Sequence, residues 1–77
     1  MDNDAIRRFV ERAARELEMA EQALAGQALY LQQVAEGIDD ESIHPDHLPV
    51  VGNRVSELRS TVDVALRQAE QYLYLAH

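Results

Sequence analysis

Six ionisable side chains gather in one short segment of the chain: Asp39, Asp40, Glu41, His44, Asp46 and His47. Imidazoles and carboxylates together can ligate zinc, nickel or copper, which makes His44, His47 and Asp46 the candidate metal ligands. The spacing does not fit a calcium loop, because the alternating Asp or Asn ligands and the central glycine are missing. We interpret the segment as a solvated acidic loop in which Asp46 caps a following helix. No metal site and no cofactor are predicted.

The remaining side chains offer no arrangement that predicts catalysis. The Ser and Thr hydroxyls are those of Ser42, Ser56, Ser60 and Thr61. None has a base and an orienting third group at a recognisable spacing, as nucleophilic catalysis requires. The 3 glycines are isolated, so no phosphate-binding loop is present, and the absence of cysteine excludes thiol chemistry and disulfides. The sequence therefore predicts a protein that is not an enzyme.

All 7 basic residues are arginines, and four of them lie near the start of the chain: Arg7, Arg8, Arg12 and Arg15. The pairs Asp4–Arg8, Glu11–Arg15 and Arg12–Glu16 are each four residues apart. Opposite charges at this spacing form solvated ion pairs on a helix, worth a few tenths of a kcal/mol each. The alternative is a small phosphate- or carboxylate-binding patch. Such a patch would be the basis of an RNA-binding function.

Proline and glycine divide the chain into its expected elements. The pattern predicts one domain over residues 1–77, with a helix over about 4–36, an acidic turn over about 37–47 and a second helix over about 48–76. Asn3 or Asp4 is the expected cap of the first helix. Gly37 stands where a left-handed residue commonly ends a helix, and Pro49 is tolerated in a first helical turn.

Apolar residues recur at alternating steps of three and four in both predicted helices, a heptad pattern that favours left-handed helix packing. The stripes are wider than one partner helix requires, so we expect a core shared by four helices. The fold class is all-α: an antiparallel two-helix hairpin that dimerises into a four-helix bundle. The expected dimer core consists of Val10, Leu17, Leu24, Leu31, Val55, Leu58, Val62 and Tyr72.

Two kinds of residue depart from the heptad pattern. Gln27 is the one polar residue on the apolar stripe of the first predicted helix. A buried polar side chain at such a position can fix the register of packed helices at a cost in stability. Several apolar residues lie outside the stripes, and methionine and tyrosine are enriched at binding surfaces. The expected partner-binding residues are Met19, Leu29, Tyr30, Leu73 and Tyr74.

The net charge of −7 argues against direct binding to nucleic acids or to anionic membranes. Without a targeting or membrane-spanning pattern, we expect a cytoplasmic protein, and the lack of lysine suggests a bacterial or phage source. Our first hypothesis is a non-enzymatic, homodimeric module that regulates or inhibits a larger protein by binding it. The alternative is an acidic inhibitor, possibly phage-encoded, that occupies a basic site of a nucleic-acid-handling machine. An RNA-binding hairpin dimer is the third hypothesis.

Overall fold

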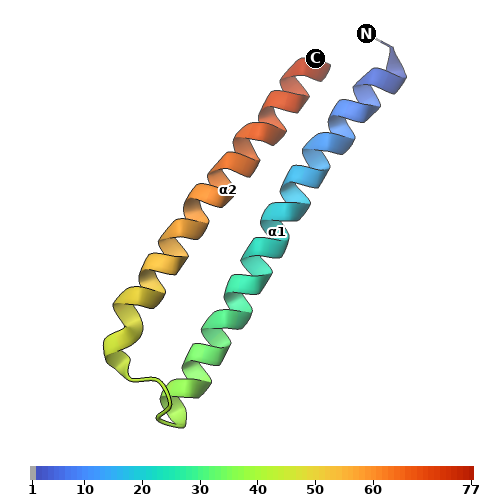
Figure 1. The fold of residues 1–77 in the computed structure, drawn as a ribbon. Helices are drawn as coiled ribbons and strands as arrows, with labels where there is room; N and C mark the ends of the chain where they lie inside the picture. The colour runs from blue at the N-terminus through green and yellow to red at the C-terminus, as the bar shows by residue number, and fades with distance from the viewer. Residues whose placement is uncertain (1) are drawn as a thin grey trace.

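The structure, a computed structural model, describes residues 2–77 as a pair of helices. Met1, with which the expected domain begins, lies outside the described residues. Helix α1 spans Asn3–Asp39, the short 3-10 helix η1 spans Pro45–His47, and helix α2 spans Leu48–Ala76. The helices α1 and α2 run side by side in opposite directions, and both chain ends lie at the same end of the hairpin (Figure 1). The predicted all-helical hairpin is confirmed.

Helix α1 begins earlier than the sequence pattern predicted. The side chain of Asp2 accepts a hydrogen bond from the backbone N–H of Ala5 at 2.7 Å. Asp2 therefore satisfies one of the free donors of the first helical turn, as an N-cap residue does. The prediction that Asn3 or Asp4 caps the helix is wrong, because both residues belong to its first turn.

Helix α1 also ends later than expected, and Gly37 does not end it. Gly37 lies within the helix and is buried, while the left-handed conformation falls on Glu41, with φ 64°. The side chain of Ile43 folds back against Gly37, and a Cβ on Gly37 would lie only 2.5 Å from Ile43 Cδ1. The backbone N–H of Ile43 donates to the Gly37 carbonyl at 2.8 Å. Glycine is thus required here for close approach and not for positive φ.

The segment before α2 is capped by a different residue from the one expected. The Nδ1 atom of His44 accepts a hydrogen bond from the backbone N–H of Asp46 at 3.1 Å, which caps η1. Asp46 itself caps no helix, so that prediction is wrong. Because α2 follows η1 directly, the residue at its N-cap position is His47, whose side chain makes no capping bond.

The two helices touch one another mainly through small residues. The buried apolar residues are Ala13, Ala20, Val34, Val51, Ala65 and Ala69. In residues 2–77 no large side chain is fully buried. The Cα atoms fill a thin slab of 59 × 17 × 8 Å, so most side chains have only one layer of helices to pack against. Neither α1 nor α2 contains a stretch apolar enough, over a sufficient length, to cross a membrane.

Candidate interaction surfaces

One broad face of the hairpin carries large aliphatic side chains along its whole length. We call it the large-residue face, and it consists of Val10, Leu17, Leu24, Leu31, Leu48, Val55, Val62, Leu66 and Leu73. Both helices contribute to it, because Leu24 of α1 lines a shallow hollow of about 290 Å³ together with Val55 and Val62 of α2. On each helix, successive members are four or seven residues apart, which is about one or two full helical turns. They therefore lie on the same side of the helix.

The large-residue face is not covered by any part of the described chain. All its members except Val62 keep 40–49% of their surface exposed. The expected dimer-core residues thus fall into two groups. Val10, Leu17, Leu24, Leu31 and Val55 are exposed on this face, whereas Val62 on the same face, together with Leu58 and Tyr72, is half-buried. A single hairpin therefore leaves most of the predicted core in contact with solvent.

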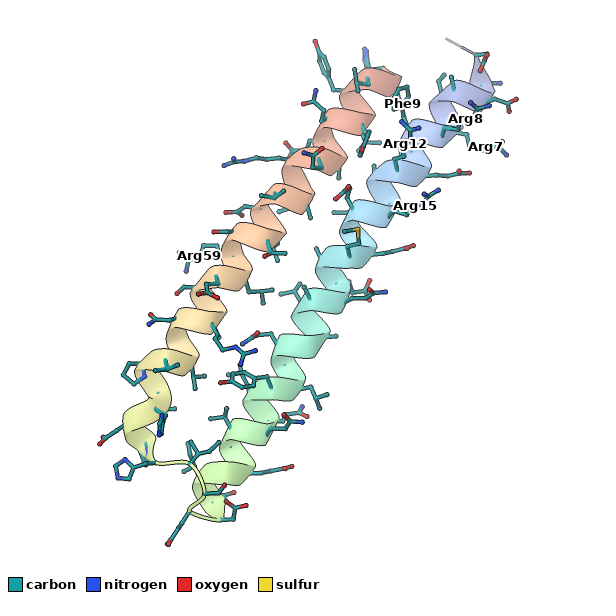
Figure 2. The ribbon with its side chains drawn as sticks, in the orientation of Figure 1. Arg7, Arg8, Phe9, Arg12, Arg15 and Arg59 are labelled. Atoms are coloured by element: carbon teal, nitrogen blue, oxygen red, sulfur yellow. The ribbon has the colours of Figure 1, made fainter. Side chains whose placement is uncertain are left out.

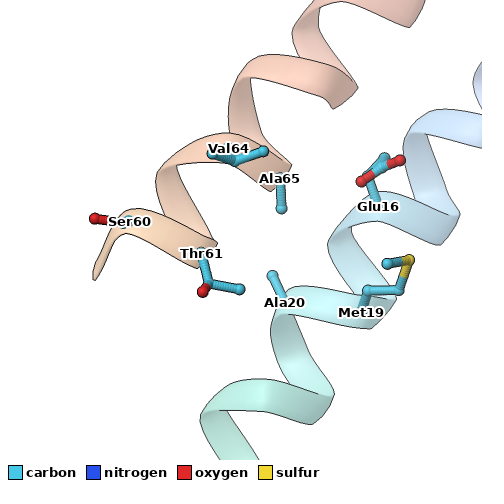
Figure 3. A pocket seen from close by; sticks show the side chains of 7 residues that line it. All are labelled: Glu16, Met19, Ala20, Ser60, Thr61, Val64 and Ala65. Atoms are coloured by element: carbon cyan, nitrogen blue, oxygen red, sulfur yellow. The ribbon is translucent and has the colours of Figure 1, made fainter. Parts of the chain in front are cut away.

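The opposite face is hollowed where the helices approach through alanines. Ala20 and Ala65 point toward one another at the floor of an open hollow of about 430 Å³ (Figure 3). Its banks are formed by Glu16 and Met19 on α1 and by Ser60, Thr61 and Val64 on α2. Met19 is 61% exposed and Val64 is 54% exposed. We call this side of the hairpin the groove face.

A second hollow, of about 210 Å³, lies on the groove face near the turn. It is lined by Tyr30 and Val34 of α1, by Val50 and Val51 of α2, and by Ser42, Ile43 and His47. The guanidinium of Arg54 stacks over the Tyr30 ring, 4.1 Å from its centroid. This cation–π contact holds Tyr30 across the gap between the helices, so the ring is half-buried instead of fully exposed.

The five expected partner-binding residues do not form one patch. Met19 and Tyr30 share the groove face, and Leu73 belongs to the large-residue face. Leu29 follows the buried Ala20 by about two and a half helical turns, so it points away from α2. The same interval separates Tyr74 from the buried Ala65, and Tyr74 is 80% exposed.

Two residues of the groove face, Val50 and Val64, were not among the expected partner-binding residues. The sequence offers one signal for them: they are two heptads apart, and both lie outside the heptad stripe of α2. That spacing places them on one side of α2.

The arginines near the start of α1 do not make the ion pairs that the sequence predicted. Arg7 is paired with Asp4 at 3.6 Å and with Glu11 at 3.7 Å, and these side chains are exposed. Arg12 lies over the rings of Phe9 and Tyr72, at 5.8 and 6.0 Å from their centroids. Figure 2 shows Arg12 and Phe9 on the side of α1 that faces α2, and Arg7 on its outer side. None of the three predicted ion pairs forms within residues 2–77: Arg7 takes the carboxylates of Asp4 and Glu11, and Arg12 lies over aromatic rings instead of pairing with Glu16.

The acidic turn is organised by its own local hydrogen bonds. The carboxylate of Asp40 accepts from the Ser42 backbone N–H at 2.9 Å. The Ser42 hydroxyl, which can rotate between Asp40 and the Gly37 carbonyl, and this N–H together lower the pKa of Asp40. Within residues 2–77, no three His, Asp or Glu side chains converge as metal ligands would.

The ring of His44 has two possible roles that exclude one another. Its Nδ1 atom lies 3.1 Å from the Asp46 backbone nitrogen and 3.3 Å from Asp46 Oδ2. An Nδ1 atom without a proton accepts the N–H and caps η1, whereas an Nδ1 atom that carries a proton donates to the carboxylate. The capping role is the one that agrees with the backbone geometry of η1.

Gln27 is the polar exception between the helices, as its position on the first stripe suggested. Its residue is half-buried, and its Nε2 atom is buried with no hydrogen-bond partner in the described part of the chain. An unpaired buried amide costs about 1–3 kcal/mol of stability. Among residues 2–77, Gln27 Nε2 is therefore the one buried side-chain polar atom without a partner, about two thirds of the way along α1.

Comparison with known proteins gives no assignment. No protein-family model matches this chain, and neither a curated protein nor a solved structure matches it at a significant level.

Proposed function

We propose that the protein is a non-enzymatic helical interaction module. Two hairpins pair through the large-residue face to form a four-helix bundle, and the dimer binds a larger protein through the groove face and regulates or inhibits it. The observation that carries the proposal is the amount of surface that a single hairpin leaves exposed.

A compact folded chain of this size exposes less surface than the hairpin does. A chain of 8.7 kDa is expected to expose roughly 4,700 Å² when folded, whereas the hairpin exposes 6138 Å². The excess of roughly 1,400 Å² falls within the area that each subunit buries in a permanent homodimer, about 1,000–2,500 Å². A second copy placed on the large-residue face would remove this excess.

The dimensions of the face agree with this area. A slab 59 Å long and 17 Å wide presents roughly 1,000 Å² on each broad side. Apolar surface contributes about 25 cal/mol per Å² when it leaves water, so the aliphatic side chains here are a large potential source of stability. Below about 80 residues, partner chains commonly supply such stability.

A second candidate function rests on the distribution of charge. Residues 19–64, the half of the hairpin nearest the turn, hold 8 Asp and Glu residues against 2 Arg residues, a net charge of −6 out of −7 for the chain. If the protein is an acidic inhibitor, this half is the surface that would occupy the basic site of a nucleic-acid-handling machine. The two candidates differ in salt dependence, because charge-based binding weakens steeply with salt and apolar binding does not.

The experiment that tests the function is affinity capture from the native host at low and high salt. Tagged wild-type protein and a Met19→Asp/Val64→Asp variant would be compared at equal amounts, with bound proteins identified by mass spectrometry. If the protein is an apolar interaction module, we expect the wild type to retain a bound protein at high salt and the variant not to recover that protein. A protein released from both by salt would favour the acidic inhibitor, and equal recovery from both at high salt would contradict binding through the groove face.

A further inference from the structure

Three arginines continue the line of Met19 toward the open end of the hairpin. Arg8, Arg12, Arg15 and Met19 follow one another at steps of four, three and four residues, so they lie along one side of α1. We call Arg8, Arg12 and Arg15 the arginine strip, and Figure 2 shows it near the open end of α1. At ~1.5 Å per residue the strip is about 10 Å long. It ends beside the hollow of about 430 Å³ that Met19 lines.

The guanidinium groups of the arginine strip are exposed and keep their charge. Within residues 2–77 the arginine that forms ion pairs is Arg7, which lies on the other side of the helix. Arg12 lies over the rings of Phe9 and Tyr72, at 5.8 and 6.0 Å from their centroids. Such a contact positions a guanidinium and does not neutralise it. The strip therefore presents three positive charges on one side of α1.

The surroundings of the arginine strip are locally basic. On this half of the groove face the acidic residues are Asp2, which caps α1, and Glu16, which borders the hollow. Three residues of α2 continue the line of Val64 toward the open end at steps of four, three and four, and all are uncharged: Gln68, Gln71 and Leu75. Three arginines thus outweigh two carboxylates at this end of the groove face.

The other acidic residues of the groove face are distant from the arginine strip. Toward the turn, Glu57 lies one heptad beyond Val64, and Glu36 lies three heptads beyond Arg15. At ~1.5 Å per residue, both are about 15 Å or more from Arg15 along the hairpin. The Debye length at physiological salt is roughly 8 Å, so their field at the strip is largely screened. The local charge, and not the net charge of −7, decides which ligand the strip attracts.

The length of the arginine strip favours a short acidic segment over a long polyanion. A nucleic acid laid along the groove would pass the strip within about 10 Å and then follow the half of the hairpin that holds a net charge of −6, residues 19–64. A protein segment can place a few carboxylates at the strip and an apolar side chain in the adjoining hollow. Because the strip and the hollow lie in line along α1, a helix can reach both.

We propose that the arginine strip is the docking site for an acidic helical segment of the partner protein. Asp or Glu side chains of that segment bind Arg8, Arg12 and Arg15, and a large apolar side chain about two turns away enters the hollow beside Met19. This inference rests on the proposed function and specifies the chemistry of its partner. The arginine–carboxylate pairs direct the approach and orientation of the segment, whereas the apolar contact provides binding that persists at high salt.

The test uses synthetic, fluorescently labelled helical peptides of about 18 residues as probes. One peptide carries a leucine and, about one to three turns further along the same side, several glutamates, and the matched control has glutamine in place of each glutamate. Fluorescence anisotropy measures binding to the full-length protein. At low salt the glutamate peptide should bind about ten-fold or more tightly than the control. At about 0.5 M salt the difference should fall to within about two-fold.

Protein variants locate the peptide on the hairpin. Arg8→Gln/Arg15→Gln should weaken binding of the glutamate peptide about ten-fold, to the level of the glutamine peptide. The matched control Arg7→Gln/Arg59→Gln changes the net charge equally away from the strip, because Arg7 is on the other side of α1 and Arg59 lines the hollow beside Leu24. It should weaken binding less than about two-fold. Equal losses in the two double variants, or equal affinity for the two peptides, would overturn the docking site.

A nucleic acid is the competing ligand, so a single-stranded RNA of about eight nucleotides is measured in the same way. Binding that is tighter than that of the glutamate peptide and is lost in Arg8→Gln/Arg15→Gln would overturn the acidic segment. RNA binding that is weaker, or that does not respond to this variant, is the expected result.

Affinity capture from the native host separates this inference from the proposed function. A partner recovered equally by the wild type and by Arg8→Gln/Arg15→Gln, but lost with Met19→Asp/Val64→Asp, would overturn the arginine strip alone. A partner whose recovery depends on neither pair of residues would contradict the groove face as the binding surface, and with it both proposals.

Discussion

The large-residue face and the groove face are formed by the same two helices but differ in construction. On the large-residue face, Leu17, Leu24 and Leu31 repeat at every heptad, and the surface is aliphatic from end to end. On the groove face, larger residues such as Met19 alternate with Ala23 and Gly26, and the surface is hollowed. An extended aliphatic face suits a second rod of equal length, whereas separate hollows suit individual side chains of a narrower ligand.

The largest effect should come from placing a charge on each face in turn. Leu24→Asp should abolish the dimer, because an unpaired carboxylate would be buried in an apolar interface at a cost of about 3 kcal/mol or more. The matched variant Met19→Asp should leave the dimer intact and stability within about 0.5 kcal/mol of wild type. Sedimentation velocity at equal concentrations measures both. Dissociation by Met19→Asp alone would exchange the roles that we assign to the two faces.

Replacing either of two α1 glycines by alanine should change the stability of the hairpin, but in opposite directions. Gly37→Ala should destabilise the hairpin by about 1–3 kcal/mol, because the new Cβ would meet Ile43 side-chain atoms at 2.5–3.2 Å. Gly26→Ala should stabilise it by about 0.5–1 kcal/mol, since Gly26 is helical with open space around it. Urea unfolding of the two variants gives the comparison. A stabilising Gly37→Ala would show that Ile43 does not pack against that helix.

Replacing Gln27 should have a moderate effect of the opposite sign to most core substitutions. Gln27→Leu should raise the melting temperature, with a gain of about 1 kcal/mol, because it removes a buried amide nitrogen that has no partner. Thermal unfolding followed by circular dichroism would measure it, with sedimentation to check the oligomeric state. A lower melting temperature with an unchanged dimer would mean that Gln27 finds its hydrogen bond across the subunit interface.

The smallest effect concerns Asp40 in the exposed turn. Because the folded state lowers the pKa of Asp40 below its usual 3.8, the ionised carboxylate stabilises the fold above that pH, and this contribution disappears as the pH falls through the folded pKa. Asp40→Asn should therefore be slightly less stable than wild type at neutral pH. The difference should vanish in acid, well below pH 4. A difference that grows on acidification would contradict this assignment.

The hairpin and its turn could be predicted from the sequence, because the heptad pattern and Pro45 and Pro49 dominate the local preferences. The details at the helix ends could not. Gly37 looked like a helix terminator, but close packing with Ile43 made a glycine necessary inside the helix, and Glu41 took the left-handed position. Asp46 looked like a cap, yet the proline before it placed His44 in that role.

The candidate surfaces were only partly predictable for a related reason. Periodicity separates residues that follow the heptad stripes from those that do not, so Met19 and Tyr30 could be recognised as apolar residues outside the stripes. It does not reveal which of two adjacent heptad lines lies between the helices. The line of small residues, with Ala13 and Ala20, is the buried one, and the line of large residues is left open. The stacking of Arg54 on Tyr30 joins residues 24 positions apart and has no local signal.

The measurement that tests the central claim most directly is the concentration dependence of assembly and stability in the wild-type protein. Sedimentation equilibrium and thermal unfolding would be recorded on the same samples from low to high micromolar concentration. If the large-residue face binds a second copy, the mass approaches twice 8.7 kDa and the melting temperature rises with concentration. A stable monomer, with a melting temperature that does not change across the range, would contradict the account.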